Sequence, residues 1–251
     1  AWFITMSIFA LVGLALLIFC FIESKERIVM DTKEASHVKV SDLWMELVRN
    51  RPLRILSFFF VIAFTTMSIS NAADSYFMSY NIGATPMMTT VFMWLGTIPA
   101  FIFLPLLPSI KRKIGKAAMF RLFLGISIVG MVLMYVIVSI PSLSSCFPLV
   151  CAIQFVKSVG ILVATGYMWA LVPEVVTFGE YTTGRRVAAI VNAIICIFMK
   201  AGMALGGVIP GFVLAWIGFN ASNQVQTPLA QQGILWLVTL IPAALFLLAT
   251  F

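Results

Sequence analysis

Two lysines of this sequence lie inside long apolar segments, where an ammonium group is costly to bury. Lys200 follows Arg186 by 14 residues, which is roughly 20 Å along a helix and near the centre of a bilayer. A charge at that depth costs about 2.5–3.5 kcal/mol, and the lysine stem is too short to snorkel to either interface. We therefore predict that Lys200 faces a polar cavity and contacts a substrate or an ion-coupled carboxylate, with a buried structural ion pair as the alternative. For Lys157, in the first half of its segment, both partial snorkelling and a functional role stay open.

Small residues line the helical face that carries Lys200. At about 100° per residue, Ala193, Cys196, Ala204 and Gly207 lie within about 40° of it. Small side chains in a membrane helix either open a cavity or let a second helix approach closely, and the two can coexist over residues 202–207. We include Cys196, one turn before Lys200, in the candidate binding face.

A stripe of polar residues follows one side of the segment 55–80. Thr66, Ser70, Asn71 and Asp74 lie along it at nearly one-turn spacing. Such a stripe usually faces a water-filled route or the interior of a helix bundle, because hydrocarbon cannot satisfy polar groups. We predict that Asn71 and Asp74 contribute to binding or coupling; for Asp74, which lies toward the end of its segment, a purely structural role is an equal alternative.

Four charged residues are concentrated at the end of the segment 147–173. Glu174 and Glu180 are followed by Arg185 and Arg186. Opposite charges at a helix–loop boundary can hold helices together in one conformation and release them in another, so we interpret this group as a cytoplasmic gate. A solvated interface without a gating role is the alternative.

These residues must be positioned by membrane helices, because the composition excludes a water-exposed surface. The chain is 62% hydrophobic and 10% charged, whereas soluble domains are about 25% charged. A membrane helix needs about 20 apolar residues, and seven segments satisfy this: 2–22, 55–80, 87–109, 118–140, 147–173, 187–216 and 231–251. Pro99, Pro105 and Pro108 break up the third segment. We predict an all-α integral membrane protein.

Several classes of function are excluded by the motifs that the sequence lacks. It has no metal-ligand cluster, no nucleophile–base pair and no phosphate-binding loop, so we expect no enzyme, no catalytic residue, no metal and no bound cofactor. The net charge of +7 does not indicate nucleic acid, because the basic residues lie in short connectors rather than on a surface stripe. Those connectors indicate a lipid environment instead.

The basic residues define the topology. Fourteen of the 16 Lys and Arg residues lie in three alternate connectors, whereas the connectors 81–87, 141–146 and 217–230 carry no charge. The positive-inside rule places the basic loops 23–54, 109–121 and 174–187 in the cytoplasm. Within the first of them, residues 41–53 predict a short amphipathic helix on the inner leaflet. The sequence begins and ends within apolar segments, from which we expect a piece of a longer protein.

The block LVPEVVTFGEYTTGRR (171–186), followed by FMKAGMALGG (198–207), resembles the C-terminal signature of the glycoside–pentoside–hexuronide:cation symporters. This branch of the major facilitator superfamily includes melibiose, xyloside and glucuronide permeases. The pattern combines acidic residues, an aromatic, Gly-Glu, Thr-Gly, an Arg and a membrane lysine, and it is met by Glu174, Phe178, Gly179, Glu180, Thr183, Gly184, Arg186 and Lys200. The segments NRPL (50–53) and NQVQTP (223–228) are similar to family members as well.

The resemblance implies helices six to twelve of a twelve-helix transporter. Residues 1–22 would be the last helix of the N-terminal half, 23–54 the central cytoplasmic loop, and 55–251 the C-terminal six-helix bundle. It also implies symport of a sugar or glycoside with Na⁺ or H⁺ across a bacterial inner membrane, by alternating access. The partners would then be the sugar, the cation, lipid and the absent N-terminal half, which holds most of the family's cation-binding carboxylates.

Two departures from the family pattern concern the sugar site. Thr177 stands where many members have a second acid, and Thr165 where one branch has a sugar-contacting tryptophan. Trp169, one turn later, is then the candidate to stack on a sugar ring. The alternative from another class is a seven-helix receptor or retinal protein, which predicts complete termini and a lysine in the last span; Lys200 lies in the sixth.

Overall fold

The computed structural model describes residues 2–24, 40–184, 188–223 and 225–250, and this part of the chain is helical without any strand. It divides into two compact units, Ala1–Lys39 and Val40–Phe251. The first unit contains α1 (Trp2–Glu23), an apolar helix with no buried residue. A helix that is apolar on all sides suits a lipid or protein environment rather than water.

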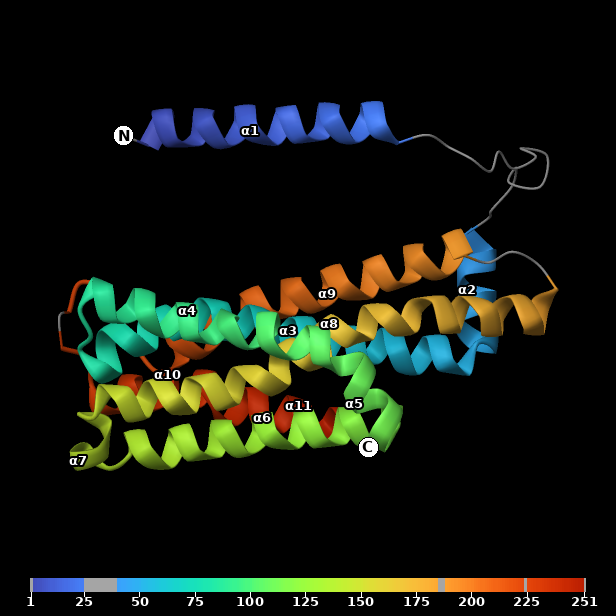
Figure 1. The fold of residues 1–251 in the computed structure, drawn as a ribbon. Helices are drawn as coiled ribbons and strands as arrows, with labels where there is room; N and C mark the ends of the chain where they lie inside the picture. Colours follow the sequence, from blue (N-terminus) through green and yellow to red (C-terminus); the bar gives the residue numbers. More distant parts are fainter. Residues whose placement is uncertain (1, 25–39, 185–187, 224, 251) are drawn as a thin grey trace. The chain divides into compact units, whose positions relative to one another are not determined.

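The second unit is a bundle of long helices, α3, α4, α6, α8 and α9 among them, drawn from blue-green to orange in Figure 1. Its elements, in chain order, are α2 (Val40–Arg49), α3 (Arg51–Tyr76), η1 (Phe77–Ile82), α4 (Pro86–Phe103), η2 (Leu104–Leu106), α5 (Leu107–Ile114), α6 (Lys116–Val138), α7 (Pro141–Ser144), α8 (Phe147–Thr183), α9 (Ala188–Trp216), α10 (Pro228–Val238) and α11 (Leu240–Ala249).

Seven helical segments of the described residues have the length and composition to cross a membrane, as the sequence predicts. They are Trp2–Glu23, Arg51–Ile82, Pro86–Ile114, Lys116–Val138, Phe147–Thr183, Ala188–Trp216 and Pro228–Ala249. The third segment is interrupted, as predicted, by a 3₁₀ turn that contains Pro105. The seventh is interrupted at Thr239; Pro242, three residues later, has no N–H to continue the helical ladder.

The start of α3 is tied to two neighbouring helices by Asn50. Its Oδ1 accepts from the backbone N–H of Leu53 at 3.0 Å, which caps the helix. Its Nδ2 donates to Glu46 Oε1 of α2 at 2.9 Å and to the Val175 carbonyl of α8 at 3.3 Å. The helix α2, in the region where the sequence predicts an amphipathic helix, is therefore anchored to the end of the bundle.

Glycines let α9 approach α3 closely. A Cβ on Gly202 would lie 2.6 Å from the Val61 carbonyl oxygen, and one on Gly206 would lie 2.6 Å from the Thr65 carbonyl oxygen. Thr65 Oγ1 donates to the Gly202 carbonyl at 3.0 Å across the same contact. In the segment 202–207, packing thus occupies one face, whereas Gly207 has open space beside its Cα.

We expect Gly206→Ala to destabilise the bundle by about 1–3 kcal/mol, because the added methyl group collides with the backbone of α3. The matched change Gly207→Ala adds the same methyl group where nothing lies within 4 Å, and alanine is the better helix former. Thermal unfolding of the two purified variants measures the difference. Equal midpoints for both variants would show that the α3–α9 contact does not require glycine.

Glycines on α6 and α8 fix the place of Lys157. A Cβ on Gly130 would lie 2.7 Å from the Lys157 backbone nitrogen, and one on Gly160 would collide with the Phe123 carbonyl. Ser127 Oγ donates to the Lys157 carbonyl at 2.6 Å. The backbone of α8 at this residue is therefore held tightly against α6, and its side chain must point elsewhere.

Candidate functional site

Lys157 forms a buried ion pair with Asp74, between α8 and α3. Lys157 Nζ lies 3.1 Å from Asp74 Oδ1, and the side chains are 1% and 12% exposed. Gln154 Nε2, one turn earlier on α8, donates to Asp74 Oδ2 at 3.2 Å. Both carboxylate oxygens are therefore engaged by α8, which is the arrangement that a charge removed from water requires. Lys157 does not snorkel.

Unpartnered polar atoms are also buried on α3 and α8 near this pair. Ser70 Oγ and Thr66 Oγ1 of α3 and Gln154 Oε1 of α8 have no hydrogen-bond partner among the described residues. Thr66, Ser70 and Asp74 are buried, so most of the predicted polar stripe faces the inside of the bundle. Asn71 is exposed instead, because it lies about 100° around the helix from Ser70.

Lys200 lies on a face of α9 that the rest of its unit leaves open. The side chain is exposed, and among the described residues it has neither an ion pair nor a hydrogen bond. Gly202 and Gly206, which pack on α3, lie 200° and 240° around the helix from Lys200 at about 100° per residue. Cys196, one turn before Lys200, is exposed on the same open face.

The two residues of α8 considered for sugar contact differ in exposure. Thr165 is 8% exposed, and its hydroxyl donates to the Ile161 carbonyl at 2.8 Å. Trp169 is 43% exposed and its ring meets that of Phe60 edge-on, with centroids 5.0 Å apart. The indole is thus supported from one side by α3 and keeps exposed surface, whereas the Thr165 hydroxyl is already engaged within its own helix.

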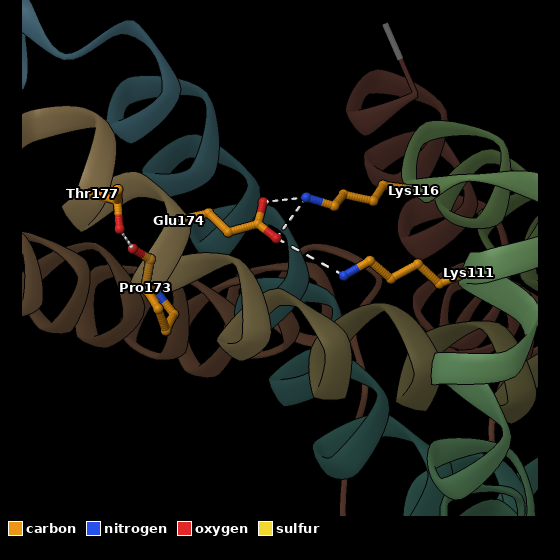
Figure 2. Close-up of polar contacts among 5 residues, drawn as sticks. All are labelled: Lys111, Lys116, Pro173, Glu174 and Thr177. Carbon is orange, nitrogen blue, oxygen red and sulfur yellow. Dashed lines mark hydrogen bonds and ion pairs between the residues drawn. The ribbon is translucent and has the colours of Figure 1, made fainter. Parts of the chain in front are cut away.

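The predicted gate residue Glu174 is bound by lysines of the preceding helices. Lys116 Nζ lies 2.5 Å from Glu174 Oε2, and Lys111 Nζ lies 3.9 Å from Oε1. Figure 2 shows the carboxylate pointing from α8 toward both lysines, with Thr177 turned away to donate to the Pro173 carbonyl at 2.9 Å. This contact holds the end of α8 against α5 and α6, within one unit.

The other predicted gate residues take no part in this contact. Glu180 is partly buried near the end of α8, which stops at Gly184, a residue with φ of 65°. Arg185 and Arg186 lie outside the described residues. Sequence reasoning did not identify Gln154 as a partner of Asp74, or Lys111 and Lys116 as partners of Glu174. Opposite charges in the sequence are the signal that could have indicated the two ion pairs: Asp74 could pair with Lys157, and Glu174 with the basic connector.

Comparison with known proteins identifies the family. A model of the family described as MFS/sugar transport protein matches residues 1–251. The chain belongs to this family. With seven helical segments of membrane-crossing length among the described residues, membership makes it a multi-pass protein of the bacterial cytoplasmic membrane, of the all-α major facilitator type; the family itself is one of transport proteins.

Similar proteins carry names of the same class. The chain is 40% identical over 248 residues to the "Uncharacterized symporter YnaJ" of Bacillus subtilis, covering 99% of this chain and 52% of that protein. It is 28% identical over 249 residues to the "Uncharacterized symporter YjmB" of the same organism (99% and 52%), and 30% identical over 242 residues to the "Glucuronide carrier protein homolog" of Escherichia coli (96% and 51%). The chain thus spans about half the length of the curated relatives that it matches.

Proposed function

We propose that this chain is the C-terminal part of a secondary transporter that couples uptake of a sugar or glycoside to a cation gradient, Na⁺ or H⁺. Membership of the sugar-transport family supports the class, and the relatives named as symporters and as a glucuronide carrier homolog support coupling and a glycoside substrate. The alternative of a seven-helix receptor or retinal protein is not favoured, because a transport family accounts for the whole chain.

The observation that carries the proposal is the open face of α9. It presents an exposed lysine, Lys200, beside the exposed Cys196, on the side of the helix away from α3. In transporters of this kind, substrate binds near the midplane between two halves that rock against each other. We assign this face to the wall of the substrate cavity, with Trp169 as a candidate to stack on a sugar ring and Asn71 as a hydrogen-bonding candidate.

Two ion pairs connect the helices of this unit, one of them buried and one at its surface. Asp74–Lys157 joins α3 to α8 within the bundle, and Glu174–Lys116 joins α8 to α6 at the opposite end of α8. We propose that these helices move as one body during alternating access. The role of Glu174, Glu180, Arg185 and Arg186 as a cytoplasmic gate is part of the same proposal.

The function is tested with the full-length protein in proteoliposomes. A panel of radiolabelled glycosides, including a glucuronide, is offered with an inward Na⁺ gradient, with an inward proton gradient and with neither. We expect accumulation of at least one glycoside above its external concentration under one gradient, and loss of this accumulation when an ionophore collapses that gradient. Glycoside entry that only equilibrates under all three conditions contradicts coupling, and no entry of any glycoside contradicts the substrate class.

A further inference from the structure

A cavity of about 590 Å³ opens between α3, α6, α8 and α11. Its floor includes Leu56, Leu124 and Val175, which are 5%, 1% and 6% exposed. Its rim includes Ile55 and Phe178, which are 61% and 42% exposed. The cavity therefore reaches from the inside of the bundle to its surface, and its volume lies in the range of about 300–1,000 Å³ that small ligands occupy.

The walls of this cavity suit a hydrocarbon chain and do not suit a sugar. Three of its 14 lining residues have polar side chains, namely Arg121, Glu174 and Thr250. The carboxylate of Glu174 is already engaged by Lys116. A sugar hydroxyl in the apolar interior would lose its hydrogen bonds to water without replacement, whereas an acyl chain loses nothing there.

The charge at the rim is positive. Arg121 Nε donates to the Ala117 carbonyl at 3.4 Å, and Arg121 forms no ion pair among the described residues. Lys111 and Lys116 share the single carboxylate of Glu174, which leaves an excess of positive charge beside the cavity. A guanidinium group with free N–H donors is suited to a phosphodiester.

The positive-inside rule places the rim near the cytoplasmic surface of the membrane. Ala117 and Arg121 are in the first two turns of α6, which follows the basic connector that the positive-inside rule assigns to the cytoplasm. Anionic lipids are attracted to basic residues at that surface, and basic pockets between membrane helices bind their headgroups. We infer that this cavity binds an anionic phospholipid of the cytoplasmic leaflet, with one acyl chain between α3, α6 and α8 and its phosphate on Arg121.

Native mass spectrometry of the full-length protein tests this site directly. The protein is equilibrated with phosphatidylglycerol or with phosphatidylcholine of the same acyl chains, and retained lipid is counted. We expect preferential retention of phosphatidylglycerol. Arg121→Gln should lower retention of phosphatidylglycerol about fivefold, the factor that corresponds to about 1 kcal/mol for one basic residue at the membrane surface. It should lower retention of phosphatidylcholine less, because the choline ammonium of that lipid already compensates the charge of its phosphate. Ala117→Trp, which fills the rim, should lower retention of both lipids.

Two variants outside the cavity serve as matched controls. Lys113→Gln removes an equal charge from the same connector, and Ala118→Trp adds an equal side chain to the next exposed position of α6. Both should retain phosphatidylglycerol as the unmodified protein does. The site is refuted if Lys113→Gln lowers retention as much as Arg121→Gln, since attraction is then diffuse. It is equally refuted if Ala117→Trp has no effect, since another segment of the full-length protein then fills the cavity.

Discussion

Replacing Lys157 with methionine is expected to destabilise the protein by about 3–5 kcal/mol, because the carboxylate of Asp74 is then left buried without its partner. Asp74→Asn should have a similar effect, since it leaves the ammonium group of Lys157, whose side chain is 1% exposed, without a counter-charge. In the double variant Asp74→Asn/Lys157→Met neither charge remains, and removing a whole buried ion pair is often nearly neutral. We therefore expect the double variant to be more stable than either single variant.

Thermal unfolding of the purified full-length protein and its abundance in the membrane measure this double-mutant cycle. The coupling energy is meaningful because the two side chains touch and each single change removes the same interaction. If the stability losses of the two single variants add, so that the double variant is the least stable of the three, the two charges do not stabilise each other. Stability alone does not show function, so glycoside uptake by the double variant indicates whether Asp74 also takes part in transport.

The sequence predicts where the membrane helices lie, but it does not predict every helix end. Hydropathy predicts a fifth span over 147–173, whereas α8 continues to Thr183. Residues 174–183 are polar enough to leave the membrane yet still helical, and hydropathy detects only the apolar part. The helix ends at Gly184, whose φ of 65° suits a residue without a side chain.

The sequence indicates which residues belong to the candidate site, but it does not indicate which of them contact one another. The cost of burying a charge identifies Asp74, Lys157 and Lys200 as unusual from sequence alone. That Lys157 contacts Asp74, 83 residues away, depends on how α6 holds α8, through Gly130, Gly160 and Ser127. Such packing is a property of three helices together, so no single segment contains it.

Lys200 differs from Lys157 in the kind of evidence that a substitution gives. Lys157 is buried and paired, so its loss acts first on folding. Lys200 is exposed on the open face of α9, so its replacement breaks no ion pair or hydrogen bond within the described residues. A loss of transport in a Lys200 variant that stays folded therefore points to the transport reaction itself.

Lys200→Ala is expected to abolish gradient-driven accumulation of the glycoside, down to the level of vesicles without protein, while insertion and thermal stability are retained. The physical reason is that a charge near the bilayer centre costs about 2.5–3.5 kcal/mol and is kept only where it meets water, a substrate or a coupled ion. Leu205→Ala, at a position of α9 that is 48% exposed, is the matched control for truncation and should transport normally.

Exchange of labelled for unlabelled glycoside at equal concentrations, without a gradient, separates the two roles of the lysine. Exchange that persists in Lys200→Ala assigns Lys200 to coupling, and exchange that is lost assigns it to substrate binding. Normal cation-driven accumulation by Lys200→Ala would remove the open face of α9 from the mechanism and leave the proposed transport function to rest on family membership.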